Sequence, residues 1–330
     1  MRKEAQKLVL SKKLITFYKS SVTDIFIMSF SLGFIGFGEA AYNMGKGLKN
    51  EGLEDIKAYD VVMDKEGPMR DTVLKRCEDA KIKAVFSTKE LVENSDVVVI
   101  AVPARFTAST ADGLKPFAKP GQLFADVTTA LPPVKEAQAK AFSELGAEYI
   151  DSAMLGSLMA LGHKVPILAS GKGCKKWHDL MTPFNMKITL VNPDDPDNTK
   201  AGEASKIKLV RSVFMKGIEG LIVETLLFAR KCGVEDYILS SISNSMNRDK
   251  FEDIALRMAG ADLIHSERRS FEVGESMELM KEVGVEPLMA MGTKERLART
   301  AALGLNEELH GIVPKEFDKI YSLWEEKKYS

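Results

Sequence analysis

Residues 32–41 read LGFIGFGEAA, the most informative part of the chain for its fold. The apolar start predicts a buried strand, the two glycines predict a tight turn, and the following residues have the apolar spacing of a helix. In such a strand–turn–helix unit, backbone N–H groups at the positive end of the helix bind a pyrophosphate. Gly36 would permit the turn, Gly38 would leave room for the phosphate, and Ala41 would let the helix pack on the strand. The stretch predicts a dinucleotide site that includes Gly36, Phe37, Gly38, Glu39 and Ala40.

Two further runs support this prediction. Residues 56–60 form a strand-like run that ends in Asp60, at the spacing typical of a carboxylate that binds ribose. Its charge favours NAD, because it would accept a hydrogen bond from the ribose 2′-hydroxyl and repel a 2′-phosphate, while Lys65 nearby leaves NADP open. Residues 97–102 are an apolar run followed by Pro103, as expected for a parallel strand buried on both faces. We place Asp60, Val102 and Pro103 in the dinucleotide site.

From residue 32 to about residue 190, strand-like runs alternate with helical stretches, which predicts an α/β domain with a parallel, doubly wound sheet. The predicted strands are 32–37, 56–59, 84–86, 97–102, 123–126, 149–151, 165–169 and 188–191. The predicted helices are 40–51, 69–80, 88–94, 105–115 and 132–145. Residues 192–198 read NPDDPDN, a turn-rich break. We therefore predict a dinucleotide-binding domain over residues 28–198.

Beyond this break the chain predicts an all-helical domain over residues 199–330. The predicted helices are 200–232, 235–246, 251–264, 270–283, 287–304 and 314–327. The first of them is long and free of proline, and apolar neighbours such as Leu209 and Val213 predict that it is largely buried.

Residues 1–27 are predicted to be a disordered extension ahead of the fold. Basic residues up to Lys19 and the apolar run 25–37 have features of a secretory signal, but cleavage after that run would remove the glycine turn. A mitochondrial transit peptide is disfavoured, because Glu4 and Asp24 are acidic and arginine is scarce. No apolar run reaches the roughly 18 residues that a membrane helix needs, so we predict no membrane partner.

The composition narrows the classes of function. The 330 residues are 45% apolar and 28% charged with a net charge of −1, which allows one or two globular domains. Near-balanced charge predicts no nucleic-acid partner. The three cysteines and four histidines lack the spacing of a metal site, so we predict no metal, a reducing compartment and a cytoplasmic location.

Two strand ends could carry chemistry, since polar groups at the carboxyl ends of parallel strands line the ligand crevice. In the first, residues 126–132, the hydroxyls of Thr128 and Thr129 would contact ligands, or one of them would only cap the next helix. In the second, residues 149–157, backbone amides near Gly156 and Ser157 would hold a carboxylate, or the segment would be an ordinary loop.

The long helix carries a row of cationic and polar side chains. Lys208, Arg211, Ser212 and Met215 fall at i, i+3, i+4 and i+7 and so share a face, with Lys216 about a quarter-turn away. Lysine and arginine on a buried helix need an anion. That anion would be a substrate, or acidic side chains in structural salt bridges.

In these stretches the chain resembles the β-hydroxyacid dehydrogenase superfamily, which includes 3-hydroxyisobutyrate and 6-phosphogluconate dehydrogenases. It is most similar to the phosphogluconate-dehydrogenase-like oxidoreductases of unassigned substrate. Residues 36–41 match the nucleotide loop, 126–129 match Asp-x-Ser-Thr, 151–157 match Asp-Ala-Pro-Val-Ser-Gly-Gly, and 202–208 match Gly-x-Gly-x-x-x-Lys. The resemblance spans about residues 32–302. It implies a Rossmann domain followed by a helical domain, with a nicotinamide cofactor and a homodimer.

The resemblance implies that Lys208 is the catalytic general acid/base. Lys206 competes for this role, but only Lys208 places Gly202, Glu224 and Gly233 on family positions without a gap. A lysine that acts as a base at neutral pH needs a lowered pKa, to which burial and neighbouring cations would contribute.

The resemblance also implies contacts with substrate and cofactor. Arg211 and Ser212 fall where relatives carry side chains that orient the substrate, and Arg211 and Lys216 would bind the carboxylate or phosphate of a small anionic substrate. The secondary substrate contacts are Thr128, Gly156 and Ser157, and Thr129 and Arg269 are assigned to the cofactor.

Two departures from the family bear on the reaction. Ser-Gly-Gly of the family becomes Leu155-Gly156-Ser157, and Met215 replaces the glutamate of 6-phosphogluconate dehydrogenase, which disfavours decarboxylation of phosphogluconate. We expect hydride transfer between nicotinamide and a small hydroxy acid or its aldehyde or keto form. The alternatives are an imine reductase or oxidative decarboxylase on the same scaffold, and a dinucleotide-binding sensor without turnover.

Overall fold

The structure, a computed structural model, describes residues 7–10, 13–16 and 30–329. The chain divides into two compact units, Met1–Ser212 and Val213–Ser330. The long helix α8 (Glu203–Cys232) contributes residues to both units. The domain boundary between residues 198 and 199 stays a prediction.

The first unit is built on an eight-stranded sheet whose order is β10-β9-β8-β7-β6-β3-β4-β5. The strands are β3 (Leu32–Ile35), β4 (Ile56–Tyr59), β5 (Lys83–Ala84), β6 (Val97–Ile100), β7 (Leu123–Asp126), β8 (Glu148–Met154), β9 (Pro166–Ser170) and β10 (Lys187–Leu190). Every residue of the central strands β3, β6 and β7 is buried, which explains their apolar sequences up to Asp126, the last residue of β7. All eight strands were predicted, with differences at their ends.

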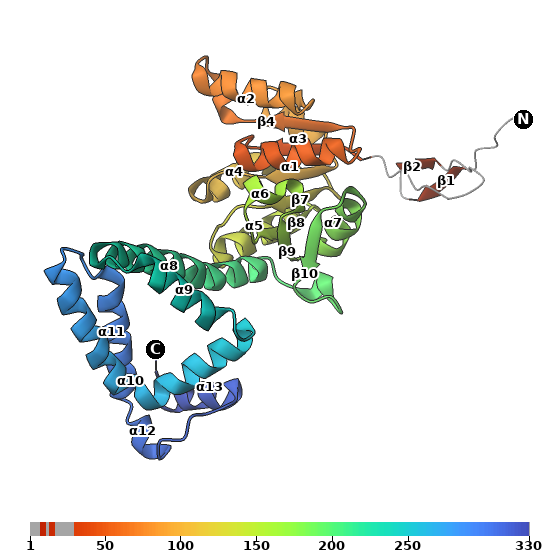
Figure 1. The fold of residues 1–330 in the computed structure, drawn as a ribbon. Coiled ribbons are helices and arrows are strands. Elements are labelled where there is room, and N and C mark those ends of the chain that lie inside the picture. The colour runs from red at the N-terminus through yellow and green to blue at the C-terminus, as the bar shows by residue number, and fades with distance from the viewer. Residues whose placement is uncertain (1–6, 11–12, 17–29, 330) are drawn as a thin grey trace, which may run out of the picture. The chain divides into compact units, whose positions relative to one another are not determined.

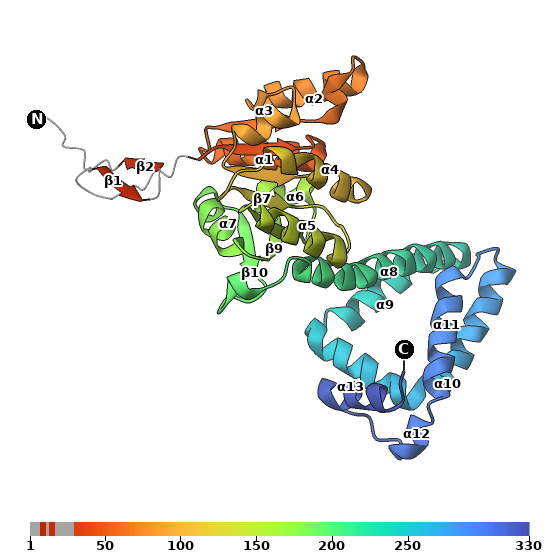
Figure 2. The ribbon, with the colours of Figure 1, turned by 180° about the vertical axis from the view of Figure 1, so that it is seen from behind.

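Helices cover both faces of this sheet (Figures 1 and 2). They are α1 (Glu39–Asn50), α2 (Pro68–Asp79), α3 (Thr88–Glu93), α4 (Thr107–Leu114), α5 (Pro132–Glu144), α6 (Leu158–Leu161) and α7 (Cys174–Met181). The first five confirm the predicted helices, whereas α6 and α7 were not predicted. The doubly wound α/β architecture is thus confirmed.

One strand pair departs from the predicted parallel sheet. β9 runs antiparallel to β8, with Asp151 opposite Ser170, while the other pairs of this sheet are parallel. Residues 155–165 connect the two strands and contain only α6 and one 3-10 turn. A parallel pair needs a crossover that carries the chain back along the sheet, usually with a full helix, and this connection is too short for one.

The second unit is helical, as predicted. Its elements after α8 are α9 (Glu235–Met246), α10 (Phe251–Glu282), α11 (Leu288–Ala301), α12 (Leu305–Glu308) and α13 (Phe317–Glu326). The two helices predicted at 251–264 and 270–283 are a single helix, because residues 265–269 contain neither proline nor glycine to end the first one. The helix α12 was not predicted.

The prediction that the long helix is largely buried is wrong for the isolated chain. Val210 is 70% exposed and Val213 is 78% exposed, and Phe214, Ile222 and Leu227 are also exposed. The apolar pattern that suggested burial inside the chain therefore marks surface that the chain alone leaves uncovered.

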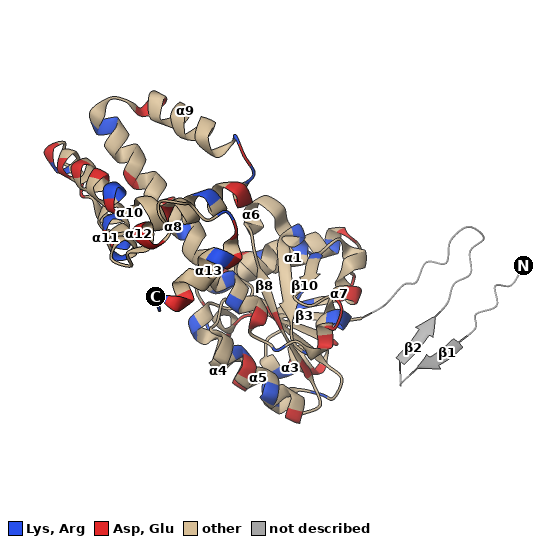
Figure 3. Cartoon of the chain, turned by 90° about the horizontal axis from the view of Figure 1, so that it is seen from below, with Lys and Arg blue, Asp and Glu red and all other residues tan. Residues whose placement is uncertain are grey.

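In the N-terminal extension, β1 (Lys7–Leu10) pairs antiparallel with β2 (Lys13–Thr16). The prediction that residues 1–27 are disordered otherwise falls on residues outside the described part. Within the described ranges, no helix is long and apolar enough to cross a membrane. Figure 3 shows lysine and arginine interspersed with aspartate and glutamate in both units. The predictions about nucleic acid and location stay predictions.

Candidate functional site

The glycine turn after β3 is tightly packed against the end of β6. Gly36 has a φ of +82°, a conformation that favours glycine. A Cβ at Gly36 would lie 2.6 Å from the carbonyl oxygen of Ala101 and 2.8 Å from Cγ1 of Val102. Glycine is therefore required here both by the backbone angle and by the close approach of the neighbouring strand.

The start of α1 has the properties of an anion site. Its N-cap residue is Gly38, and among the described residues no side chain caps the first amides of the helix. A Cβ at Gly38 would meet no atom within 4 Å, so the space beside these amides is open. Unsatisfied N–H groups at a helix N-terminus attract phosphate groups. Glu39, in the first turn, is exposed, and Ala40 is half-buried.

Phe37 and Asp60 hold this turn in place. The Phe37 amide donates to Oδ2 of Asp60 over 2.8 Å, and its side chain is fully buried against Phe34. The other carboxylate oxygen of Asp60 accepts from the amide of Val62 over 3.1 Å. The Phe37 amide is thus used inside the protein, while half-buried Asp60 ties the glycine turn to the end of β4 and still borders solvent.

The strand register brings the predicted site segments to one edge of the sheet. Ile35 lies opposite Tyr59 and Ile100, Ile100 opposite Asp126, and Asp126 opposite Asp151. The segments that follow this row are the glycine turn, Asp60, residues 102–103, residues 128–129 and the last part of β8. Parallel strands present their carboxyl ends to the same crevice, so these segments, far apart in sequence, converge.

Within these segments, exposure separates the predicted residues. Pro103 and Thr129 are exposed and Val102 is half-buried, so all three border solvent. Thr128 is buried, and its hydroxyl lies 2.7 Å from that of Thr107. Of the two threonines, Thr129 therefore has the accessible hydroxyl, and the side chain of Thr128 joins β7 to α4.

The loop after β8 is exposed where a carboxylate was predicted to bind. Gly156 and Ser157 are exposed, and the amide of Leu155 just before them donates to the carbonyl of Pro166 over 2.7 Å. This bond extends the β8–β9 pairing beyond the last strand residues. The loop is thereby held at its base, with its tip open to solvent.

The start of α8 is fastened to the same row of the sheet. Oδ2 of Asp151 accepts from the amides of Gly202 (3.1 Å) and Ser205 (2.7 Å), and Oδ1 accepts from the Ser205 hydroxyl (2.7 Å). The hydroxyl of Ser170, opposite Asp151 in the sheet, accepts from the amide of Ala204 over 3.1 Å. These bonds satisfy N–H groups that a helix leaves unpaired at its first turn.

Lys208 lies one turn beyond this anchored start, about 4.5 Å further along the helix axis. It is half-buried, as is Ser212, whereas Arg211 and Lys206 are exposed. Exposure of Lys206 agrees with its predicted place on the other side of the helix. Lys216 belongs to the helical unit.

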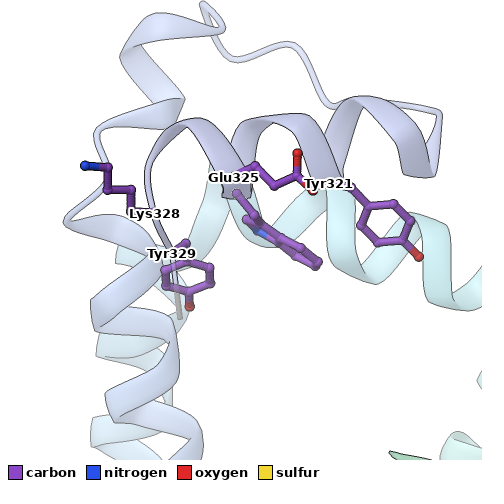
Figure 4. A pocket seen from close by; sticks show the side chains of 5 residues that line it. Tyr321, Glu325, Lys328 and Tyr329 are labelled. Carbon is purple, nitrogen blue, oxygen red and sulfur yellow. The ribbon is translucent and has the colours of Figure 1, made fainter. Parts of the chain in front are cut away.

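Arg269 also belongs to the helical unit, and the assignments of Lys216 and Arg269 stay predictions. A cavity of about 420 Å³ in that unit is lined by Tyr321, Trp324, Glu325, Lys328 and Tyr329 (Figure 4). It contains none of the predicted site residues. Among the described residues there is no cluster of three or more histidine, cysteine, aspartate or glutamate side chains that could hold a metal ion.

Sequence reasoning missed a buried charge cluster beneath the site. Lys135 on α5 is fully buried between Asp126 and Asp151, with its Nζ 2.7 Å and 3.4 Å from their carboxylate oxygens. The sequence shows Asp126 and Asp151 as charged residues within otherwise apolar predicted strands. Nothing in the sequence around Lys135 predicted that a helix would bring a lysine to them.

Known proteins and family models match both parts of the chain. Residues 31–183 match the NAD binding domain of 6-phosphogluconate dehydrogenase, and residues 229–300 match a domain of unknown function, DUF1932. The mitochondrial 3-hydroxyisobutyrate dehydrogenase of Homo sapiens is 30% identical over 133 residues, 39% of this chain and 37% of the human protein. The first unit therefore carries the NAD binding domain of 6-phosphogluconate dehydrogenase, and the chain is similar to members of the β-hydroxyacid dehydrogenase superfamily. The predicted resemblance is confirmed.

Two further proteins are similar to this chain over most of its length. An uncharacterised 28.5 kDa protein of Methanothermus fervidus is 26% identical over 263 residues, 80% of this chain and 96% of that protein. The V8 variant of an imine reductase from Myxococcus stipitatus, solved with NAD+, has a TM-score of 0.67 at 15% identity, over 84% of this chain and 96% of that chain. The latter shows a shared fold. The matched NAD binding domain and the dehydrogenases and reductases among the similar proteins support an NAD(P)-dependent oxidoreductase with a nicotinamide cofactor.

Proposed function

We propose that this oxidoreductase transfers a hydride between nicotinamide and a small hydroxy acid, or the matching aldehyde or keto acid, with Lys208 as the general acid/base. The observation that carries the proposal is the attachment of α8 to Asp151 and Ser170, in the sheet row next to the glycine turn. It supports a position for Lys208 beside the crevice in which the dinucleotide site lies.

When bound, the nicotinamide supplies or accepts the hydride. In the reductive direction, the ammonium group of Lys208 would donate a proton to the substrate oxygen as the carbonyl carbon gains the hydride, and in the oxidative direction the amine would take that proton back. The exposed guanidinium of Arg211 would bind the substrate carboxylate with two parallel hydrogen bonds. The open amides near Gly156 and Ser157 would supply further donors.

The test follows NADH oxidation with a panel of short aldehyde and keto acids that includes glyoxylate and succinic semialdehyde. We expect Lys208→Met to lower kcat by a factor of about 100 or more, the scale of general acid–base catalysis. The matched control is Lys206→Met on the exposed side of the same turn, which we expect to leave kcat within about twofold. Retention of most activity in Lys208→Met at saturating substrate would refute the proton role.

An imine reductase is the second candidate, favoured by the fold shared with the Myxococcus stipitatus enzyme. The same assay run with a cyclic imine, and with a ketone plus an amine, discriminates the two. Oxidation of NADH only with the imine would replace the hydroxy acid proposal. Binding of NADH without oxidation by any member of the panel would instead indicate a sensor.

We also propose NAD as the preferred cofactor. Asp60 is held at the end of β4 by two backbone amides, and its carboxylate still borders solvent. A negative charge there would accept from a ribose 2′-hydroxyl and oppose a 2′-phosphate. A lower dissociation constant for NADPH than for NADH, measured by fluorescence titration, would contradict this assignment.

A second copy of the chain is the proposed partner of the helical unit. Among the described residues of the helical unit, the cluster of buried apolar side chains is small and consists of Leu263, Leu305, Ile320 and Leu323. Helix α9 has no buried residue, although Leu239 is 53% exposed and Ile242 is 47% exposed. A 12-residue helix without tertiary packing is marginal in water, so this surface requires a cover.

Light scattering coupled to size-exclusion chromatography tests the homodimer. We expect twice the mass of one chain, and a monomer after Ile242→Glu places a charge in the apolar surface. A folded monomer at micromolar concentration for the unchanged protein would contradict the proposal.

A further inference from the structure

A fully buried charge cluster joins three elements at the base of the proposed site. Nζ of Lys135 on α5 lies 2.7 Å from Oδ2 of Asp126 on β7 and 3.4 Å from Oδ1 of Asp151 on β8. It also donates to the carbonyl oxygens of Asp126 (3.2 Å) and Thr128 (3.1 Å). All three charged side chains have 0% exposure.

This cluster is costly unless its charges balance, because a buried ion without a partner loses several kcal/mol of hydration. Asp126 and Asp151 are direct neighbours across β7 and β8, so without Lys135 two carboxylates would face each other in the interior. Tyr149 donates a hydrogen bond to Asp126, and burial followed by the Asp126 charge raises the pKa of Tyr149, so its hydroxyl remains a donor. Among the described contacts, Lys135 is the cation that pairs with both carboxylates.

The second role of Asp151 connects this cluster to α8. The carboxylate that Lys135 neutralises accepts from the amides of Gly202 and Ser205 and from the Ser205 hydroxyl. Gly202 has a φ of +107°, and a Cβ there would lie 2.9 Å from the carbonyl of Pro132, the first residue of α5. The starts of α5 and α8 are therefore in close contact around one ion cluster.

We propose that Lys135 is a positioning residue for the reaction: through the charge of Asp151 it fixes the first turn of α8, and hence the place of Lys208. The inference rests on the proposed role of Lys208. Lys135 does not touch the substrate or the cofactor in this scheme. Its ammonium group holds the Asp151 carboxylate in place, so that the carboxylate can accept three hydrogen bonds from the start of the helix.

Hydrogen exchange followed by mass spectrometry tests the proposal without any substrate. In Lys135→Met we expect amides of residues 202–208 to exchange about tenfold faster, while peptides of α1 keep their protection. The matched control is Lys140→Met, an exposed lysine on the same helix α5, which should leave both regions unchanged. Unchanged exchange over 202–208 in Lys135→Met would overturn the proposal.

A double-mutant cycle with Asp151→Asn separates positioning from a general loss of structure. Lys135→Met leaves two facing negative charges, and Asp151→Asn alone turns an amide group toward the ammonium. The double variant removes both conflicts, since the asparagine oxygen can still accept from the α8 amides. We expect amides of residues 202–208 to exchange at least about threefold more slowly in the double variant than in Lys135→Met. Purely additive losses of protection would contradict action through Asp151.

Kinetics then distinguishes this inference from the proposed function. With the aldehyde acid that is turned over fastest, Lys135→Met should lower kcat about tenfold and leave the dissociation constant of NADH within about twofold. If Lys135→Met does not fold, Ser205→Ala, which removes only the hydroxyl contact to Asp151, should lower kcat about threefold with NADH binding intact. Normal kcat in both variants would refute the positioning role even if Lys208 is essential. An active Lys208→Met would refute the proposed function whatever the exchange data show.

Discussion

Replacing Gly47 by alanine tests how closely the segment after β8 packs on α1. A Cβ at Gly47, in the last turn of α1, would lie 2.0 Å from Nδ1 of His163 and 2.6 Å from its Cγ. His163 belongs to the 3-10 turn Gly162–Lys164, and its buried ring has Nε2 at 3.3 Å from Oε1 of Glu51. The ring can avoid the new methyl group only by leaving this position.

Two opposing effects set the magnitude. Alanine in place of glycine stabilises a helix by about 0.5–1 kcal/mol. Overpacking of a well-filled site costs about 1–3 kcal/mol, and contacts as short as these favour the upper part of that range. We therefore expect Gly47→Ala to destabilise the first unit by about 1–2 kcal/mol. In Gly113→Ala on α4 the new Cβ would meet no atom within 4 Å, so we expect stabilisation by about 0.5–1 kcal/mol.

Tryptophan fluorescence during urea unfolding measures this difference. The chain has two tryptophans, and Trp177 is fully buried in the first unit, so a Trp324→Phe background makes it the reporter of that unit. The two alanine variants should differ by about 1.5–3 kcal/mol in the free energy of unfolding. In a His163→Ala background the cost of Gly47→Ala should fall, because the ring is gone. Equal or greater stability of Gly47→Ala than of Gly113→Ala would refute the packing argument.

Three further perturbations have expected outcomes. Glu224→Ala removes the carboxylate that accepts from the first amides of α11 (2.7 and 2.9 Å). Urea unfolding followed by circular dichroism should show a free energy of unfolding lower by about 1–3 kcal/mol, and almost no change for Glu219→Ala at an exposed position. Burial lowers the pKa of His163 below 6.5. The neutral ring therefore contributes fully to the folding stability above pH 6.5, and this contribution is lost as the pH falls. A His163→Gln variant should therefore show a flatter dependence of its unfolding midpoint on pH between about 6.5 and 5, and an unchanged slope would contradict this. Gly202→Ala, strained by its φ of +107° and by the carbonyl of Pro132, should lower both the unfolding midpoint and kcat, and wild-type values for both would contradict the close contact of α5 and α8.

Local patterns predicted most of the first unit correctly. The apolar run before Gly36, the glycine turn and the helix that follows are each specified by neighbouring residues, and the structure contains all three. The antiparallel β9 and the single helix α10 were missed for different reasons. The direction of β9 depends on the length of the connection from β8. The single helix α10 depends on whether the helical pattern continues through the five polar residues 265–269.

The site shows the same division. The sequence alone predicted which segments lie at the candidate site, because a glycine turn and polar strand ends are short-range signals. How individual groups are used depends on the folded chain: the amide of Phe37 donates to Asp60, and Asp151 caps α8 while it contacts Lys135. These pairings join residues far apart in the chain. They arise from strand register and helix packing, which no local pattern of residues encodes.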